Sequence, residues 1–276
     1  MRFDKAKLVF RKDWIEIRRN WQVILPIVLL PIIISVVLPV IITSIPLLVP
    51  ASQIQTQATG GDPLIQNLPA SVQELLAEMT DMQSMVYVLG LYFLAPFFLI
   101  IPLMASSVIA SDSFAGEKER KTIEALLATP ISDSELLFGK MLVSFVPSML
   151  VTIVSFAVYS LIFDVLSFGI LDGMILLPNL NWIMMIFGLA PTLALASIGL
   201  TVIISSRVKG FREAQQISVI LLLPILALVF GQVAGAVIFG PLMIALLIAV
   251  FVAIDFVVFR IGVTLFKREE ILAKLA

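Results

Sequence analysis

Long apolar runs, such as residues 23–49 and 217–259, are the feature that most limits what this chain can fold into. About 20 predominantly apolar residues in a helix cross the hydrocarbon core of a bilayer, and a helix satisfies its own backbone groups in lipid. Hydrophobic residues make up 60% of the chain, above the roughly 45–50% of a soluble domain. We therefore expect an all-α integral membrane protein with six transmembrane helices, at about 22–49, 84–111, 136–163, 182–205, 214–233 and 241–259. Five of these six segments contain an interior proline, which predicts kinked helices.

All 18 lysine and arginine residues fall on one side of these predicted spans. They lie in segments 1–21, 112–140, 206–213 and 260–276, whereas the loops at about 50–83, 164–181 and 234–240 contain none. Basic residues stay on the cytoplasmic side of a membrane. Both termini are therefore expected in the cytoplasm, the number of spans is even, and the protein is expected in the cell (plasma) membrane.

Three regions follow from this topology. Residues 1–21 form a cytoplasmic interfacial helix, 22–260 the transmembrane domain and 261–276 a cytoplasmic tail. Within the domain, 50–83 is an external loop and 112–135 a cytoplasmic loop.

The N-terminal helix and the external loop each show a pattern of helical period. In residues 1–21, one stripe runs along Phe3, Phe10, Trp14, Ile17 and Trp21, which suits a helix lying at the headgroups. Such a helix is either a plain anchor or a mechanical element. In the loop, a capping-box pattern at Ser71 and Glu74 opens an apolar stripe, Val72, Leu75, Leu76, Met79 and Met82, which predicts a short helix on the outer face.

Catalytic residue patterns are missing. The chain has no histidine and no cysteine, so it has neither a His-Glu-x-x-His zinc site nor a serine–histidine pair. Its only Gly-Lys pair, Gly139-Lys140, lacks the rest of a phosphate-binding loop. We expect no enzyme activity, no cofactor in this chain and no nucleic-acid partner. Asp255 is the only acid well inside a predicted span; it either helps to bind a cation or is satisfied by water or a basic neighbour such as Arg260.

The segment 111–133 is the most informative part of the chain. Glu117 and Lys121 are an i, i+4 pair on a charged stalk that extends the second span. Beyond it, Ile123, Leu126 and Leu127 share one helical face, and Pro130 ends that short helix. This apolar knob fits a groove, either on a partner or on its own chain; the alternative is an ordinary loop helix resting on the membrane.

The run Phe114-Ala-Gly-Glu-Lys-Glu-Arg-Lys-Thr-Ile-Glu-Ala-Leu-Leu-Ala-Thr-Pro-Ile-Ser resembles the coupling region of the ABC-2 type permeases of ATP-binding-cassette transporters. The continuation Glu135-Leu-Leu-Phe-Gly-Lys is similar to the start of their third span. A second run, Ser205-Ser-Arg and Phe211-Arg-Glu-Ala-Gln-Gln, is similar to the loop before the fifth span in the sodium-extruding and multidrug branch. The family usually has glycine where Lys121 stands.

This resemblance implies a mechanism. The chain would be the permease subunit of an exporter, beside a second permease copy or paralogue in the lipid. Two copies of a cytosolic ATPase would bind ATP and Mg and drive transport. Residues 1–21 would be the elbow helix. The implied ATPase-coupling residues are Glu117, Glu119, Lys121, Ile123, Leu126, Leu127 and Pro130. A secondary contact is implied at Arg207, Arg212 and Glu213. The alternative function, from another class, is a membrane scaffold or assembly factor that recruits a cytosolic protein.

Overall fold

The computed structural model describes residues 3–48, 68–122, 131–208, 210–234 and 239–265. Every regular element within these ranges is helical, and η denotes a stretch of π-helix or, for η5, of 3-10 helix. In chain order they are α1 (Phe3–Ile17), α2 (Trp21–Ile32), η1 (Ile33–Val37), α3 (Leu38–Leu48), α6 (Ala70–Ala77), α7 (Asp81–Val88), η2 (Leu89–Phe93), α8 (Leu94–Phe98), α9 (Ile100–Ser111), η3 (Asp112–Gly116), α10 (Glu117–Glu119), α12 (Asp133–Ser167), α13 (Leu180–Met184), η4 (Met185–Leu189), α14 (Ala190–Ser205), α15 (Phe211–Ser218), η5 (Val219–Leu222), α16 (Leu223–Val233) and α17 (Pro241–Leu265).

Six helices in the described ranges are long and apolar enough to cross a membrane, as the sequence predicts. They run over Trp21–Ile45, Asp81–Glu119, Glu135–Ser167, Leu180–Ser205, Phe211–Val233 and Pro241–Gly262. The predicted six-span, all-helical fold is thus confirmed. The largest difference is the second span, which begins earlier and continues beyond residue 111, because its charged extension stays helical.

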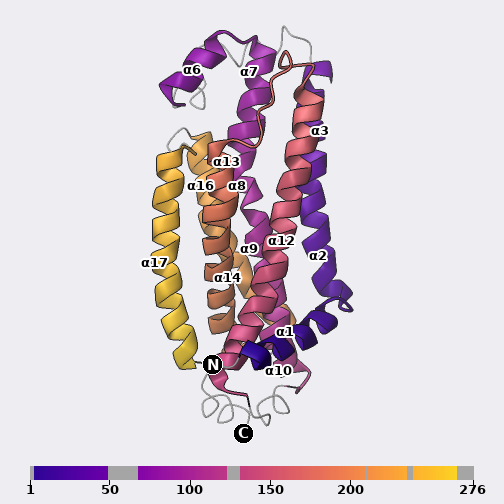
Figure 1. Ribbon diagram of the computed structural model, residues 1–276, viewed down its shortest axis with the longest axis vertical. Coiled ribbons are helices and arrows are strands. Elements are labelled where there is room, and N and C mark those ends of the chain that lie inside the picture. The colour runs from indigo at the N-terminus through magenta and orange to yellow at the C-terminus, as the bar shows by residue number, and fades with distance from the viewer. Residues whose placement is uncertain (1–2, 49–67, 123–130, 209, 235–238, 266–276) are drawn as a thin grey trace.

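The six helices stand side by side in one elongated bundle (Figure 1). The second span is the most buried of the six and packs through α9 against α2, α12 and α14, whereas α17 lies at the edge against α14. α1 lies across one end of the bundle beside α12, and α6 lies at the opposite end. We call these the α1 end and the α6 end.

Widened, π-helical turns precede a proline in three spans. η1, η2 and η4 each end two or three residues before a proline, respectively Pro39, Pro96 and Pro191. A proline ring has no N–H to donate and clashes with the carbonyl four residues earlier, so the preceding turn opens. No proline closely follows η3, and η3 coincides with the polar cluster described below.

Three successive carbonyls of η2 accept hydrogen bonds from side chains of three other spans. The Tyr159 hydroxyl donates to Gly90 O at 2.6 Å, and Trp182 Nε1 donates to Leu91 O at 3.0 Å. The next carbonyl, of Tyr92, accepts from the Gln232 amide at 2.7 Å. Polar donors that would be costly in lipid are thereby satisfied at the centre of the core, and they fix the second span to its neighbours.

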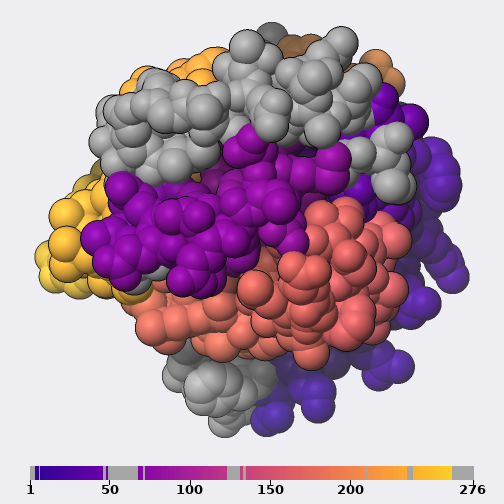
Figure 2. All heavy atoms as spheres, turned by 90° about the horizontal axis from the view of Figure 1, so that it is seen from above, coloured from indigo at the N-terminus to yellow at the C-terminus, as the bar shows by residue number. Residues whose placement is uncertain are grey.

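The predicted outer helix is divided into two at the α6 end. α6 begins after Pro69 without a side-chain cap, so the predicted Ser71/Glu74 capping box is wrong. The box lies instead at Thr80 and Gln83, which start α7 and the second span. Figure 2, which looks onto this end, shows the purple atoms of α6 and α7 beside salmon atoms of the connection after α12, where Gln83 donates to Asp172 at 2.8 Å.

Candidate functional site

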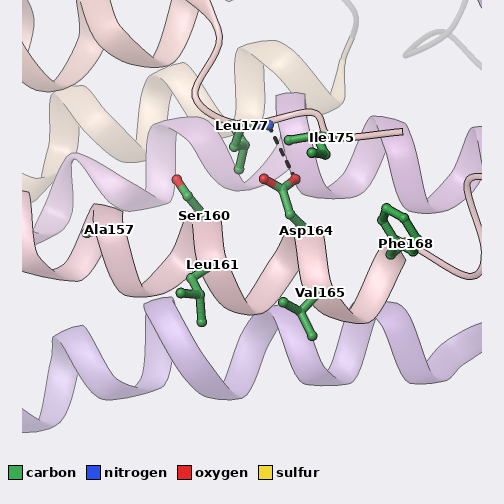
Figure 3. A pocket seen from close by; sticks show the side chains of 8 residues that line it. All are labelled: Ala157, Ser160, Leu161, Asp164, Val165, Phe168, Ile175 and Leu177. Carbon is green, nitrogen blue, oxygen red and sulfur yellow. Dashed lines mark hydrogen bonds between the residues drawn. The ribbon is translucent and has the colours of Figure 1, made fainter. Parts of the chain in front are cut away.

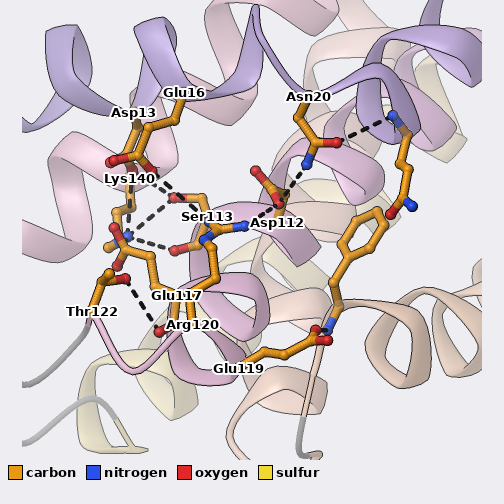
Figure 4. A network of polar contacts seen from close by, with 12 residues as sticks. Asp13, Glu16, Asn20, Asp112, Ser113, Glu117, Glu119, Arg120, Thr122 and Lys140 are labelled. Atoms are coloured by element: carbon orange, nitrogen blue, oxygen red, sulfur yellow. Dashed lines mark hydrogen bonds and ion pairs between the residues drawn. The ribbon is translucent and has the colours of Figure 1, made fainter.

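A fully buried lysine is the centre of a polar cluster at the α1 end (Figure 4). Lys140, in the second turn of α12, has no solvent-exposed surface. Its Nζ lies 2.6 Å from Glu117 Oε2 and 3.3 Å from Asp13 Oδ2, and it donates to Ser113 O at 2.5 Å. A buried ammonium requires this number of acceptors because dehydrating it is costly. Lys140 therefore joins α1, η3, α10 and α12 at one point.

The N-terminal helix contributes an acid to this cluster from its buried face. Val9, Asp13 and Ile17, spaced four residues apart, are buried side chains of α1. Asp13 also accepts a hydrogen bond from the Ser113 hydroxyl at 2.7 Å. Of the stripe expected to lie at the headgroups, Ile17 is buried, whereas Phe10 and Trp14 are half-buried and stack with ring centroids 6.5 Å apart.

A second lysine closes the cluster on its open side. Lys12 is paired with Glu117, with Asp13 at 3.2 Å and with Glu16 at 3.2 Å. Partial burial lowers the pKa of Lys12, but the hydrogen bond that it donates to Glu117 and the charges of the three acids raise it more, so the pKa lies above its usual range. Lys12 is therefore charged at neutral pH, and together with Lys140 it faces the two buried acids, Asp13 and Glu117.

An adjoining ion pair fixes the turn between α9 and α10. The buried carboxylate of Asp112 accepts from Arg120 Nη1 at 3.0 Å and from Asn20 Nδ2 at 3.1 Å. Burial lowers the pKa of Arg120, but its hydrogen bond to Asp112 and the nearby acids raise it overall. A Cβ at Gly116 would lie 2.9 Å from Asp112 Oδ1 and 3.1 Å from Arg120 Nη1, so glycine leaves room for this pair. Asn20 also caps α2 through Gln22 N.

The same turn is bonded to the connection between α14 and α15. Lys118 Nζ donates to Val208 O at 2.9 Å, and Glu119 Oε2 accepts from Phe211 N at 2.9 Å. A Cβ at Gly210 would lie 2.6 Å from Glu119 Oε2, so this approach also needs glycine. The basic segments 112–140 and 206–213, which are separate loops in the sequence, are therefore in contact through Lys118 and Glu119.

Two details of the predicted stalk are wrong. Glu117 is 1% exposed and pairs with Lys12 and Lys140, not with Lys121. Lys121 has a φ of 57°, in the left-handed region, so the helix has ended there. The charged turn is thus packed into the protein through Glu117, whereas Glu119, Arg120 and Lys121 are exposed. The predicted knob and helix end, Ile123, Leu126, Leu127 and Pro130, lie outside the described residues.

The residues predicted for a secondary contact lie on the surface near this cluster. Arg207, Arg212 and Glu213 are all exposed, on either side of Val208 and Phe211, which Lys118 and Glu119 bond. The structure therefore brings them to the same end of the bundle as Glu117.

Asp255 is separate from the cluster, on α17. Its Oδ1 is buried and has no hydrogen-bond partner in the described part of the chain. Arg260, a suggested partner, stacks instead over the Phe256 ring at 4.7 Å.

Sequence reasoning missed Asp13 and Lys140 as site residues. Asp13 lies four residues after Val9 and four before Ile17, on the same face of a helix. An acid on such an apolar face indicates that it has a partner inside the protein. Lys140 lies one turn inside a long apolar helix, where a charge needs a counter-ion. Each signal was readable, but the sequence does not show that the two residues meet.

Fold and site together define a helical polytopic membrane protein with a charge-balanced ion cluster at one end of its spans. The sequence matches the family described as ABC-2 family transporter protein over residues 8–246, which is most of the chain. The chain belongs to this family, and the expected resemblance to ABC-2 type permeases is confirmed. It is therefore a membrane permease subunit of an ABC transporter, and permeases of this family generally work with an ATPase partner. A comparison with curated proteins gives no match.

Proposed function

We propose that this chain is the permease of an ABC exporter in which the segment 123–130 docks on a separate cytosolic ATPase and the buried ion cluster passes its displacement to the spans. Two ATPase copies and a second permease copy or paralogue complete the complex. The exporter lies in the plasma membrane with the α1 end in the cytoplasm, because the described basic residues gather at that end. ATP and Mg are bound by the ATPase and not by this chain.

One observation carries this proposal: the buried Lys140 contacts Glu117, six residues before the docking segment begins, and Asp13 on α1. α12 starts at residue 133, three residues after the same segment ends. A force on 123–130 therefore reaches both α10 and α12 within a few residues. Because α1, α10 and α12 share Lys140, they move together and not one by one.

The docking test uses Leu126→Asp with the partner ATPase co-expressed. Truncating an interface anchor costs about 2 kcal/mol or more, which is about 30-fold in affinity. We expect a loss of that size in co-purified ATPase and a parallel loss of transport, with normal insertion into the membrane. Gln57→Asp, in the loop predicted to be external, is the matched control and should change neither. Equal recovery of ATPase by both variants contradicts the docking assignment.

The orientation has its own test, because the chain contains no native cysteine. Single cysteines at Gln57 and at Lys274 are exposed to an impermeant thiol reagent in intact cells. Labelling at Gln57 with protection at Lys274 is expected, and the opposite pattern refutes a cytoplasmic α1 end.

A further inference from the structure

A groove near the α6 end is unrelated to the ion cluster (Figure 3). Its volume is about 570 Å³, within the roughly 300–1,000 Å³ of small-molecule sites. The last turns of α12 and its C-cap form one side, through Leu161, Val165 and Phe168, and the connection after α12 forms the other through Ile175. Apolar side chains thus line a space open to the bundle surface.

The groove contains two polar groups, both from one face of α12. Ser160 and Asp164 are four residues apart, and their oxygens point into the same space (Figure 3). Asp164 Oδ1 accepts from the backbone N–H groups of Leu176 at 3.1 Å and Leu177 at 3.3 Å, which closes the connection against the helix. No hydrogen bond in the described chain reaches Oδ2, and the buried Ser160 hydroxyl has no partner there either. Oδ1 of Asp164 therefore holds the connection against the helix, whereas Oδ2 is available to a ligand.

No described cation can neutralise Asp164. Lys140 is the nearest lysine or arginine along α12, 24 residues away, or about 36 Å at 1.5 Å per residue. The described residues of the α6 end, 68–83, 164–181 and 230–240 apart from the undescribed 235–238, contain five acids and no lysine or arginine. An anionic ligand would be repelled here, and a neutral one would leave a carboxylate unpaired among apolar side chains.

We propose that this groove binds an amphiphilic organic monocation, whose ammonium or amidinium group pairs with Asp164 Oδ2 and Ser160 while its apolar body lies along Leu161, Val165 and Phe168. The Asp164 carboxylate favours a cationic head group, and the apolar lining of the groove favours an apolar body. This site does not depend on coupling to an ATPase.

Binding is measured with rhodamine 6G as the probe, by fluorescence anisotropy on the full chain in dodecyl maltoside, an uncharged detergent. Asp164→Asn keeps an oxygen for the two backbone N–H groups but removes the charge, so the fold is preserved. We expect saturable binding to wild type and a loss of about tenfold or more in the variant, as for a charged hydrogen bond. Asp172→Asn, at the same end but outside the groove, should bind as wild type does.

Two further arms make the result decisive. Leu161→Lys places an ammonium three residues before Asp164, where it can pair with the carboxylate and fill the groove, so it should abolish binding. Dodecylammonium should displace the dye, and dodecanol should not. Equal binding by wild type, Asp164→Asn and Leu161→Lys overturns the site. Equal losses in Asp164→Asn and Asp172→Asn assign the effect to general surface charge and also overturn it. Displacement by added phosphatidylethanolamine at equimolar ratio makes the groove a lipid headgroup site, against the proposal.

Discussion

Replacing Lys140 by methionine tests whether the ion cluster holds the α1 end together. Methionine keeps much of the side-chain volume but removes the charge. In the native chain Lys140 Nζ is 2.6 Å from Glu117 and 3.3 Å from Asp13, and these acids are 1% and 2% exposed. In the variant both carboxylates stay buried with Lys12 as their shared cation, so one negative charge is uncompensated.

Removing one partner of a buried pair typically destabilises a protein by about 3–5 kcal/mol. For a chain of this size, each kcal/mol lowers the melting temperature by about 2–4 °C. The expected decrease for Lys140→Met is therefore roughly 6–20 °C. Adding Glu117→Gln to the variant restores the charge balance and should recover at least about half of that loss.

The assay is thermal unfolding of the purified chain in detergent, followed by tryptophan fluorescence, since Trp14 lies on α1 itself. Lys7→Met, an exposed lysine on the same helix, is the matched control and should change stability by about 0.5 kcal/mol or less. If Lys140→Met melts within about 2 °C of wild type, the cluster does not stabilise this end and the reasoning fails.

Three other substitutions test the fold by the same melting assay. Lys121→Gly should stabilise by up to about 1 kcal/mol, because a left-handed φ of 57° costs a residue with a side chain about 1–2 kcal/mol and glycine's greater freedom when unfolded offsets part of it; a lower melting temperature contradicts this. Trp182→Phe should destabilise by about 1–3 kcal/mol, because Leu91 O loses its donor in the core; an unchanged melt means that the carbonyl finds another donor. Gly90→Ala places a Cβ 2.1 Å from the fully buried Phe163 ring and should cost about 1–3 kcal/mol, and no loss would show that this ring can move.

The six-span fold was predictable because its signal is local. Each span is a continuous apolar segment, and in lipid such a segment has no alternative to a helix. Where the prediction was wrong, a second residue far away in sequence or a turn geometry decided the outcome. The start of the second span depends on the Thr80/Gln83 box, which has the same pattern as the rejected box at Ser71.

The candidate site was predictable only in part, because its contacts are long-range. The motif identifies Glu117 as important, but the favourable spacing to Lys121 gave it the wrong partner. Its real partners, Lys12 and Lys140, are 105 and 23 residues away in sequence. A surface pair four residues apart gains only a few tenths of a kcal/mol, whereas an unpaired buried carboxylate costs several, so tertiary packing overrides the local pair.

The composition of the cluster limits how the α1 end can move. An apolar contact between α1 and α12 would tolerate small shifts, because the hydrophobic effect has no direction. Ion pairs of 2.6–3.3 Å between Lys140 and the acids of two other elements tolerate them less, because separating the charges by one ångström loses about a quarter of their Coulomb energy, which is large in a dry environment. Apolar residues of similar size would often be as stabilising or more so. The buried ions therefore fix the relative positions of α1, α10 and α12 more than they add to stability. Such fixed positions are what these helices need if they are to pass a displacement of residues 123–130 on to the spans.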